Sequence, residues 1–257
     1  FPFLHGIDAP MYYVALMTFI LIFSSVTMVL AVDAGHHMNK SKVTFYMLLT
    51  IIGGAVFVGS QAWEWKNFIK GEYGALETKG GQILQFVNAD TGKRASISDF
   101  AISIPTERSA HKGNNGVWYK NEGSLPSYSV NEVVQGFKAN KKLLVRSEKL
   151  DTNGHKIILS RDNSLDKVEN AVAVVEGANL IHNEYGNRLF ADFFFFITGF
   201  HGFHVFSGVV INLIIFFNVL IGTYERRGHY EMVEKVGLYW HFVDLVWVFV
   251  FTFFYLV

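Results

Sequence analysis

Apolar residues gather in four long blocks that charged residues interrupt only once. Residues 11–32, 43–63 and 193–224 contain no Asp, Glu, Lys or Arg, and residues 236–257 contain only Asp244. About 20 mainly apolar residues are needed for a helix to cross a bilayer. We therefore predict four transmembrane helices, in preference to a soluble protein with four buried helices.

The segment between the second and third blocks has a different composition. Residues 70–184 are rich in Gly and Asn and carry charges of both signs. Residues 82–87 and 143–146 have the length and composition of strands. Within 143–160, two β-prone runs flank Asp-Thr-Asn-Gly, which predicts a hairpin. Residues 131–140 predict a short helix.

These patterns predict an all-α transmembrane bundle of four spans with an inserted small α+β extramembrane domain. Residues 1–69 would hold the first two spans, residues 70–184 the inserted domain, and residues 185–257 the last two spans. The chain begins at Phe1 without an initiator Met and shows no signal peptide, so we expect residues to be missing upstream.

Basic residues in the short loops indicate the orientation. The first loop, residues 33–42, carries Lys40 and Lys42, and the third loop, residues 225–235, is similarly basic. Such loops favour the cytoplasmic side. We therefore expect a multi-pass protein of a bacterial plasma (inner) membrane, with residues 70–184 in the periplasm.

Charge and cysteine content exclude several function classes. The formal net charge is +0 and the pI is near 7.3, which argues against nucleic acid as a partner. The chain has no Cys, which excludes disulfides, thiolate catalysis and cysteine-held iron–sulfur clusters.

Polar side chains at membrane depth are costly and therefore informative. Gln61 and Glu64 lie three residues apart, on one face of the second predicted helix. Glu64 stands between Trp63 and Trp65 in the sequence. Glu64 could bind a lipid headgroup or belong to a proton path. The alternative is an ordinary interfacial acid with its carboxylate in water.

The third and fourth blocks repeat this spacing of three. His201 and His204 lie in the third block, where Gly199, Gly202 and Gly208 would let another helix approach closely. His241 and Asp244 lie in the fourth, one helical turn apart, where they could pair with each other or with the histidines of the third block. A metal or haem site is one interpretation. We favour interhelical hydrogen bonds, because His201 and His204 project from one face of one helix.

Two strings resemble the cytochrome c oxidase subunit III family. TGFHGFHVFSG (198–208) resembles the signature of that family's sixth helix, and EKVGLYWHFVDLVWVFVF (234–251) that of its seventh. Weaker similarity extends upstream, in SSVTMVLAVDAGHH (24–37) and LLTIIGGAVFVGSQAWEW (48–65). The resemblance covers most of the predicted membrane part and none of residues 70–184. The family's earlier helices, one of which bears a buried acid, have no counterpart here.

The resemblance implies a subunit without haem or copper that flanks the catalytic subunit, holds phospholipid between its helices and sustains proton uptake. It implies no catalytic residue and no metal ligand in this chain. It points to two groups of positions. Lipid-binding or proton-path candidates are Gln61, Glu64, Arg226, Arg227 and Glu234. Bundle-packing polar residues are His201, His204, Trp240, His241 and Asp244.

We therefore expect a non-catalytic accessory subunit of a proton-pumping haem-copper oxidase in aerobic respiration. Its expected partners are oxidase subunits I and II, which would carry the haem and copper, and membrane phospholipids. Residues 70–184 could dock a cytochrome or a neighbouring respiratory complex. The alternatives are a stand-alone electron carrier using the histidines, a transporter using Glu64 and Asp244, and a sensor whose external domain binds a ligand.

Overall fold

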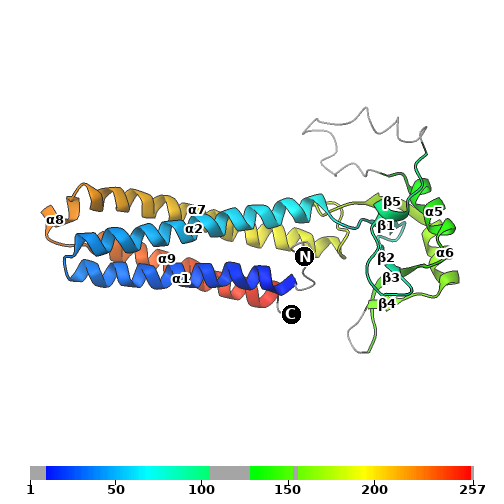
Figure 1. Ribbon diagram of the computed structural model, residues 1–257, viewed down its shortest axis with the longest axis horizontal. Coiled ribbons are helices and arrows are strands. Elements are labelled where there is room, and N and C mark those ends of the chain that lie inside the picture. Colours follow the sequence, from blue (N-terminus) through cyan, green and yellow to red (C-terminus); the bar gives the residue numbers. More distant parts are fainter. Residues whose placement is uncertain (1–9, 105–127, 153–155, 256–257) are drawn as a thin grey trace. The chain divides into compact units, whose positions relative to one another are not determined.

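The computed structural model describes residues 10–104, 128–152 and 156–255 (Figure 1). Four long helices dominate it: α1 (Pro10–His36), α2 (Lys40–Lys70), α7 (Arg188–Leu220) and α9 (Glu231–Tyr255). Each is long and apolar enough to cross a membrane. The prediction of four spans is confirmed, and the chain is a multi-pass membrane protein.

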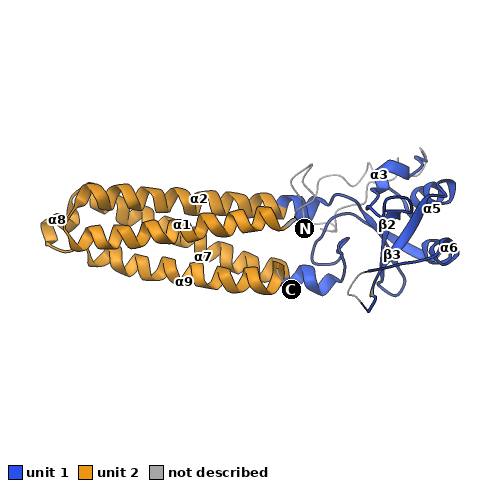
Figure 2. Cartoon of the chain, turned by 60° about the horizontal axis from the view of Figure 1, so that its bottom comes forward, with its two compact units in different colours: residues 1–2, 66–193 blue, residues 3–65, 194–257 orange. Residues whose placement is uncertain are grey.

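The chain divides into two compact units (Figure 2). The bundle comprises Phe3–Trp65 and Phe194–Val257, and its four helices run side by side. The sheet domain contains Lys66–Phe193, including the last residues of α2 and the first of α7. The predicted domain limits at residues 70 and 184 stay a prediction.

The connections between paired helices are shorter than predicted. Helix α1 continues to His36 and α2 begins at Lys40, so only three of the residues 33–42 lie between helices. The third apolar block, residues 193–224, does not form a single helix. Helix α7 ends at Leu220, and Gly222 then adopts a left-handed φ of 78°. The short helix α8 (Thr223–Arg227) follows, and a second left-handed glycine, Gly228, ends it.

Trp240 of α9 occupies the centre of the bundle and is fully buried. A Cβ on Gly54 of α2 would come within 2.5 Å of its Cη2 atom, and a Cβ on Gly208 of α7 within 2.9 Å of its Cζ3 atom. Glycine at these two positions therefore makes room for the indole. Of the three glycines predicted to permit close approach, Gly199 and Gly208 face side chains of another helix. Gly202 does not, because nothing lies within 4 Å of its Cβ position.

The sheet domain is built on a five-stranded antiparallel sheet of order β4-β3-β2-β1-β5. The strands are β1 (Ala75–Thr78), β2 (Ile83–Asn88), β3 (Leu143–Leu150), β4 (Lys156–Ile158) and β5 (Ala171–Val175). β3 and β4 pair as the predicted hairpin, although its residues 153–155 lie outside the described residues. The strand predicted at 82–87 is β2. The inserted domain is therefore α+β, as expected.

Among the described residues of this domain, short helices accompany the sheet: α3 (Ile97–Phe100), α5 (Val130–Ala139) and α6 (Arg161–Glu169). α5 is the helix predicted at 131–140. A capping box begins it, with Ser129 Oγ accepting from Glu132 N and Glu132 Oε2 accepting from Ser129 N. Its apolar face places Val133 and Phe137 in the same core as Phe86 of β2.

Candidate functional site

Glu64 lies in a closed polar cluster in the bundle. Gln61 Nε2 donates to Glu64 Oε2 at 2.9 Å, as the spacing of three predicted for a shared face. Tyr255 Oη donates to both carboxylate oxygens, at 3.0 and 3.2 Å. Glu64 is only 1% exposed, so its interpretation as an interfacial acid in water is wrong. No sequence pattern singles out Tyr255, which lies 191 residues from its partner.

This arrangement limits what Glu64 can do chemically. A carboxylate that accepts hydrogen bonds from a phenol and an amide is held in one orientation, within reach of a proton donor. A lipid headgroup would have to displace Tyr255 or Gln61 before it could contact the carboxylate. The geometry therefore suits proton holding or helix linkage better than direct lipid contact.

His201 and His204 of α7 have different surroundings. The His201 ring is buried, stacks on Trp247 at 5.0 Å between ring centroids, and meets Phe57 edge-on at 5.8 Å. Neither of its nitrogens has a hydrogen-bond partner among the described residues. His204 Nδ1 instead bonds to the carbonyl oxygen of Phe200 in its own helix, at 2.7 Å. The predicted interhelical hydrogen bonds of these two histidines are not formed.

Both histidines line one groove between α7 and α9. The groove has a volume of about 340 Å³. Its other lining residues are apolar: Phe196, Ile197, Phe200, Phe242, Val243 and Val246. Among the described residues, no group of three or more His, Cys, Asp or Glu side chains could hold a metal ion.

The polar residues of α9 pair with α1. His241 Nδ1 lies 2.6 Å from Ser25 Oγ, and Trp240 Nε1 donates to Ser24 Oγ at 3.1 Å. Asp244 is buried and Ser25 lies near its carboxylate, but neither carboxylate oxygen meets the geometry of a hydrogen bond with a described residue. The predicted pairing of His241 with Asp244, or with the α7 histidines, is therefore wrong.

A further bond extends this seam between α1 and α9. Trp247 Nε1 donates to Thr18 Oγ1 at 3.0 Å, two helical turns from the Trp240 bond. Interhelical hydrogen bonds of this kind are worth about 0.6–2 kcal/mol each in membrane proteins. Thr18 and Trp247 could not be singled out from the sequence, because a hydroxyl or an indole in an apolar block carries no signal until the two helices are known to face each other.

The remaining candidates lie at the bundle end where the short connections are. Arg226 and Arg227 are exposed on α8, and Glu234 is exposed in the first turns of α9. Lys40 of α2 forms an ion pair with Glu225 of α8 at 3.2 Å. Glu234 also lines a pocket of about 350 Å³ between the two connections. Guanidinium groups so exposed can bind phosphate bidentately.

Comparison with known proteins covers the last two spans. Residues 179–257 match the family model described as cytochrome c oxidase subunit III. These two spans are similar to the cytochrome c oxidase subunit III family. The match holds both strings whose resemblance the sequence analysis noted. The upstream similarity in the first two spans lies outside it and stays a prediction.

Curated relatives carry the same description. Cytochrome c oxidase subunit 3 of Thermostichus vulcanus is 40% identical over 79 residues, which are 28% of this chain and 37% of that protein. The corresponding protein of Synechocystis is 44% identical over 78 residues, covering 29% and 33%. The probable subunit 3 of Rickettsia conorii is 38% identical over 74 residues, covering 28% and 26%. The chain thus spans about a third of these relatives' length, or less.

Proposed function

We propose that this chain is an accessory subunit of a haem-copper terminal oxidase, in the place of subunit III. The observation that carries the proposal is the match of residues 179–257, which includes two complete spans. The assembled enzyme would reduce oxygen and translocate protons, with haem and copper held by subunits I and II. This chain would contribute no redox centre.

We assign the chain a supporting role within that complex. The polar contacts of α1 with α9, and the closed cluster around Glu64, support a rigid bundle that flanks a catalytic subunit. Glu64 would hold a proton on an uptake path, with Gln61 orienting it. Arg226 and Arg227 would bind phospholipid phosphate at the cytoplasmic surface, and Glu234 would lie beside them.

The sheet domain would serve the opposite face. Facing the periplasm, where electrons reach an oxidase, it would dock a cytochrome or a neighbouring respiratory complex. Deleting residues 71–183 should then weaken association with that component and spare assembly with subunits I and II. If both associations are lost, the domain is needed for folding and the docking role is excluded.

Purification tests the whole proposal. The tagged full chain would be isolated in mild detergent, and its reduced-minus-oxidised absorbance spectrum recorded along with mass spectrometry of the bound polypeptides. Haem bands together with a catalytic subunit and a copper-binding subunit are expected. Haem bands without a partner polypeptide would instead support an electron carrier with its own histidine ligands. A colourless, solitary chain would refute the oxidase assignment.

A further inference from the structure

A tight turn leads from the sheet domain into α7 and presents two large apolar side chains. Ala178 and Asn183 form a β-bridge across it, and Asn179 N donates to the carbonyl oxygen of His182 at 2.8 Å. Asn179 Oδ1 accepts from the backbone N–H groups of Ile181 and His182, both at 2.7 Å. At the tip, Leu180 is 66% exposed and Ile181 52% exposed.

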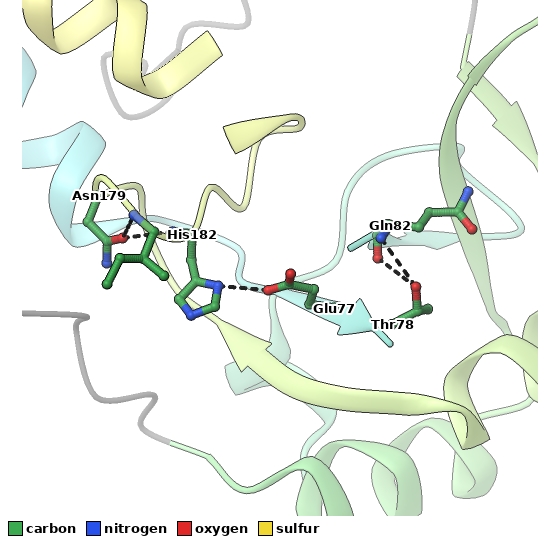
Figure 3. Close-up of polar contacts among 6 residues, drawn as sticks. Glu77, Thr78, Gln82, Asn179 and His182 are labelled. Carbon is green, nitrogen blue, oxygen red and sulfur yellow. Dashed lines mark hydrogen bonds and ion pairs between the residues drawn. The ribbon is translucent and has the colours of Figure 1, made fainter. Parts of the chain in front are cut away.

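This turn is held in place at both of its ends. Ala178 N donates to the carbonyl oxygen of Phe68, in the last turn of α2, at 3.0 Å. On the far side, His182 Nδ1 lies 2.7 Å from Glu77 Oε2 of strand β1 (Figure 3). Asn183 Nδ2 also donates to the carbonyl oxygen of Asn187, just before α7 begins. The exposed tip is therefore displayed on a fixed support.

The support of the turn includes the end of a candidate membrane-spanning helix. α2 contains 31 residues, and at a rise of 1.5 Å per residue it is about 46 Å long. The hydrocarbon core is about 30 Å thick, and about 40–45 Å with the headgroup regions. A span of this length would bring its last turn to the headgroup region, and Ala178 is bonded to Phe68 in that last turn.

Apolar exposure continues from the turn onto the helix ends of the same domain. Ile69 of α2 and Leu189 and Phe193 of α7 are exposed, as lipid-facing residues of a span would be. Leu180 and Ile181 are exposed in the same domain, and the polar Asn179 and His182 flank them in the sequence. An apolar tip with a polar border suits the boundary between headgroups and acyl chains.

We propose that residues 179–182 form an interfacial anchor, in which Leu180 and Ile181 insert into the phospholipid leaflet on the side of the sheet domain. Burial of the two side chains would remove their apolar surface from water. The hydrogen bonds to Phe68 and Glu77 would transmit this attachment to α2 and to the sheet. The partner is the lipid surface itself, so the anchor does not depend on the oxidase assignment.

Single cysteines can test the anchor, because the chain contains none of its own. Full-length Leu180→Cys and Ile181→Cys variants would carry a nitroxide label in phosphatidylcholine and phosphatidylglycerol vesicles. Their collision rates with oxygen, which partitions into lipid, and with a water-soluble nickel chelate would be measured. Val172→Cys on β5 is the matched control, since Val172 is 57% exposed in the same domain.

Oxygen access should exceed nickel access several-fold at positions 180 and 181, and the order should reverse at 172. Equal nickel access at all three positions would overturn the proposal, because the turn would then lie in water. A second outcome would also overturn the proposal: labels that are shielded from both oxygen and nickel when partner subunits are retained, and that become accessible when those subunits are removed. In that case the apolar tip contacts protein and not lipid.

Discussion

The two units each bury a glutamate almost completely, and they satisfy its carboxylate in different ways. Glu64 of the bundle is 1% exposed and receives hydrogen bonds from the side chains of Gln61 and Tyr255. Glu184 of the sheet domain is 0% exposed and receives four backbone N–H groups. In the first case the donors come from side chains, and in the second from the main chain.

The backbone explains this difference. Within a membrane-spanning helix, N–H groups are already bonded to carbonyls four residues earlier, so only side chains can reach a buried acid. In the sheet domain, the donors to Glu184 are Glu72, Tyr73, Gly74 and Gly177, which lie in turns. Left-handed φ angles of 72° at Gly74 and 71° at Gly177 expose these N–H groups to one carboxylate.

The largest expected effect is that of Glu184→Gln. One carboxylate oxygen would become an NH₂ group facing N–H donors, and buried charge-assisted bonds would be lost. We expect the sheet domain to lose about 3–5 kcal/mol of unfolding free energy, in line with the removal of one partner from a buried charged network. Hydrogen exchange of the Tyr73, Gly74 and Gly177 amides, in the full chain in nanodiscs, would measure it.

Glu169→Gln provides the control for that substitution. Glu169 pairs with Lys138 at 2.7 Å, but its side chain is exposed, and exposed ion pairs contribute about 0–1 kcal/mol. Exchange at the three amides should therefore stay unchanged. Similar protection in Glu184→Gln and Glu169→Gln would show that the backbone donors do not depend on the carboxylate charge.

The bundle should depend on close helix approach instead, and Gly54→Ala tests this. The added methyl would meet Trp240 at 2.5 Å and Val209 at 2.7 Å. Overpacking of this kind costs about 1–3 kcal/mol. We expect a lower midpoint of thermal unfolding in detergent, followed by the fluorescence of the buried tryptophans.

Gly202→Ala is the matched control within the bundle. Nothing lies within 4 Å of its Cβ position, and alanine is favoured over glycine in helices by about 1 kcal/mol. The midpoint should stay the same or rise. If Gly54→Ala and Gly202→Ala lower it equally, the destabilisation does not arise from the contact with Trp240.

The sequence predicted the elements well and the partners poorly. Long apolar blocks with at most one charged residue located the four spans, and turn residues located the β3–β4 hairpin, because both signals are local. The spacing of Gln61 and Glu64 also predicted a shared face. Tyr255, 191 residues from Glu64, could not be paired with it without knowing that α2 and α9 meet. For His241, the sequence suggested Asp244 or the histidines of α7 as partners, yet its partner Ser25 lies on α1.

Glu184 illustrates the second limit. In the sequence it is one of 22 acidic residues, in a segment of mixed charge with no motif around it. Its donors are backbone groups, which every residue except proline possesses. These four N–H groups meet at Glu184 only because the chain passes through two turns that contain Gly74 and Gly177. The residue types alone do not predict that arrangement.

A smaller effect is expected from breaking the Glu64 cluster. Tyr255→Phe removes one donor from the carboxylate and should cost about 1–2 kcal/mol of bundle stability. Glu64→Ala should cost a similar amount, and the double variant little more than either, since both remove the same bond. In the oxidase assignment, initial oxygen consumption should persist in Glu64→Ala, while lipid content or lifetime during turnover changes. Immediate loss of turnover in an assembled complex would contradict an accessory role.

The smallest expected effect is the dependence of the sheet domain's unfolding free energy on the protonation of Lys156. Burial lowers the pKa of Lys156 to about 8, and repulsion by Arg146 and Arg94 adds to this while Glu148 opposes it. The pKa of an unfolded lysine is about 10.4, so between these values the folded state releases its proton first. Unfolding free energy should therefore rise as pH increases from 8 to 10, and be lowest below pH 8, where both states are charged.

Lys156→Met should remove that rise, as measured by urea unfolding of the full chain in nanodiscs at several pH values. Lys142→Met is the control. Lys142 is exposed and bonds to Asp90 at 2.7 Å, which raises its pKa, so it keeps its proton across this window in both states. The rise should persist in Lys142→Met. A rise that survives in Lys156→Met would assign the pH dependence to another group, and the sheet domain would then tolerate its half-buried lysine as a fully charged residue.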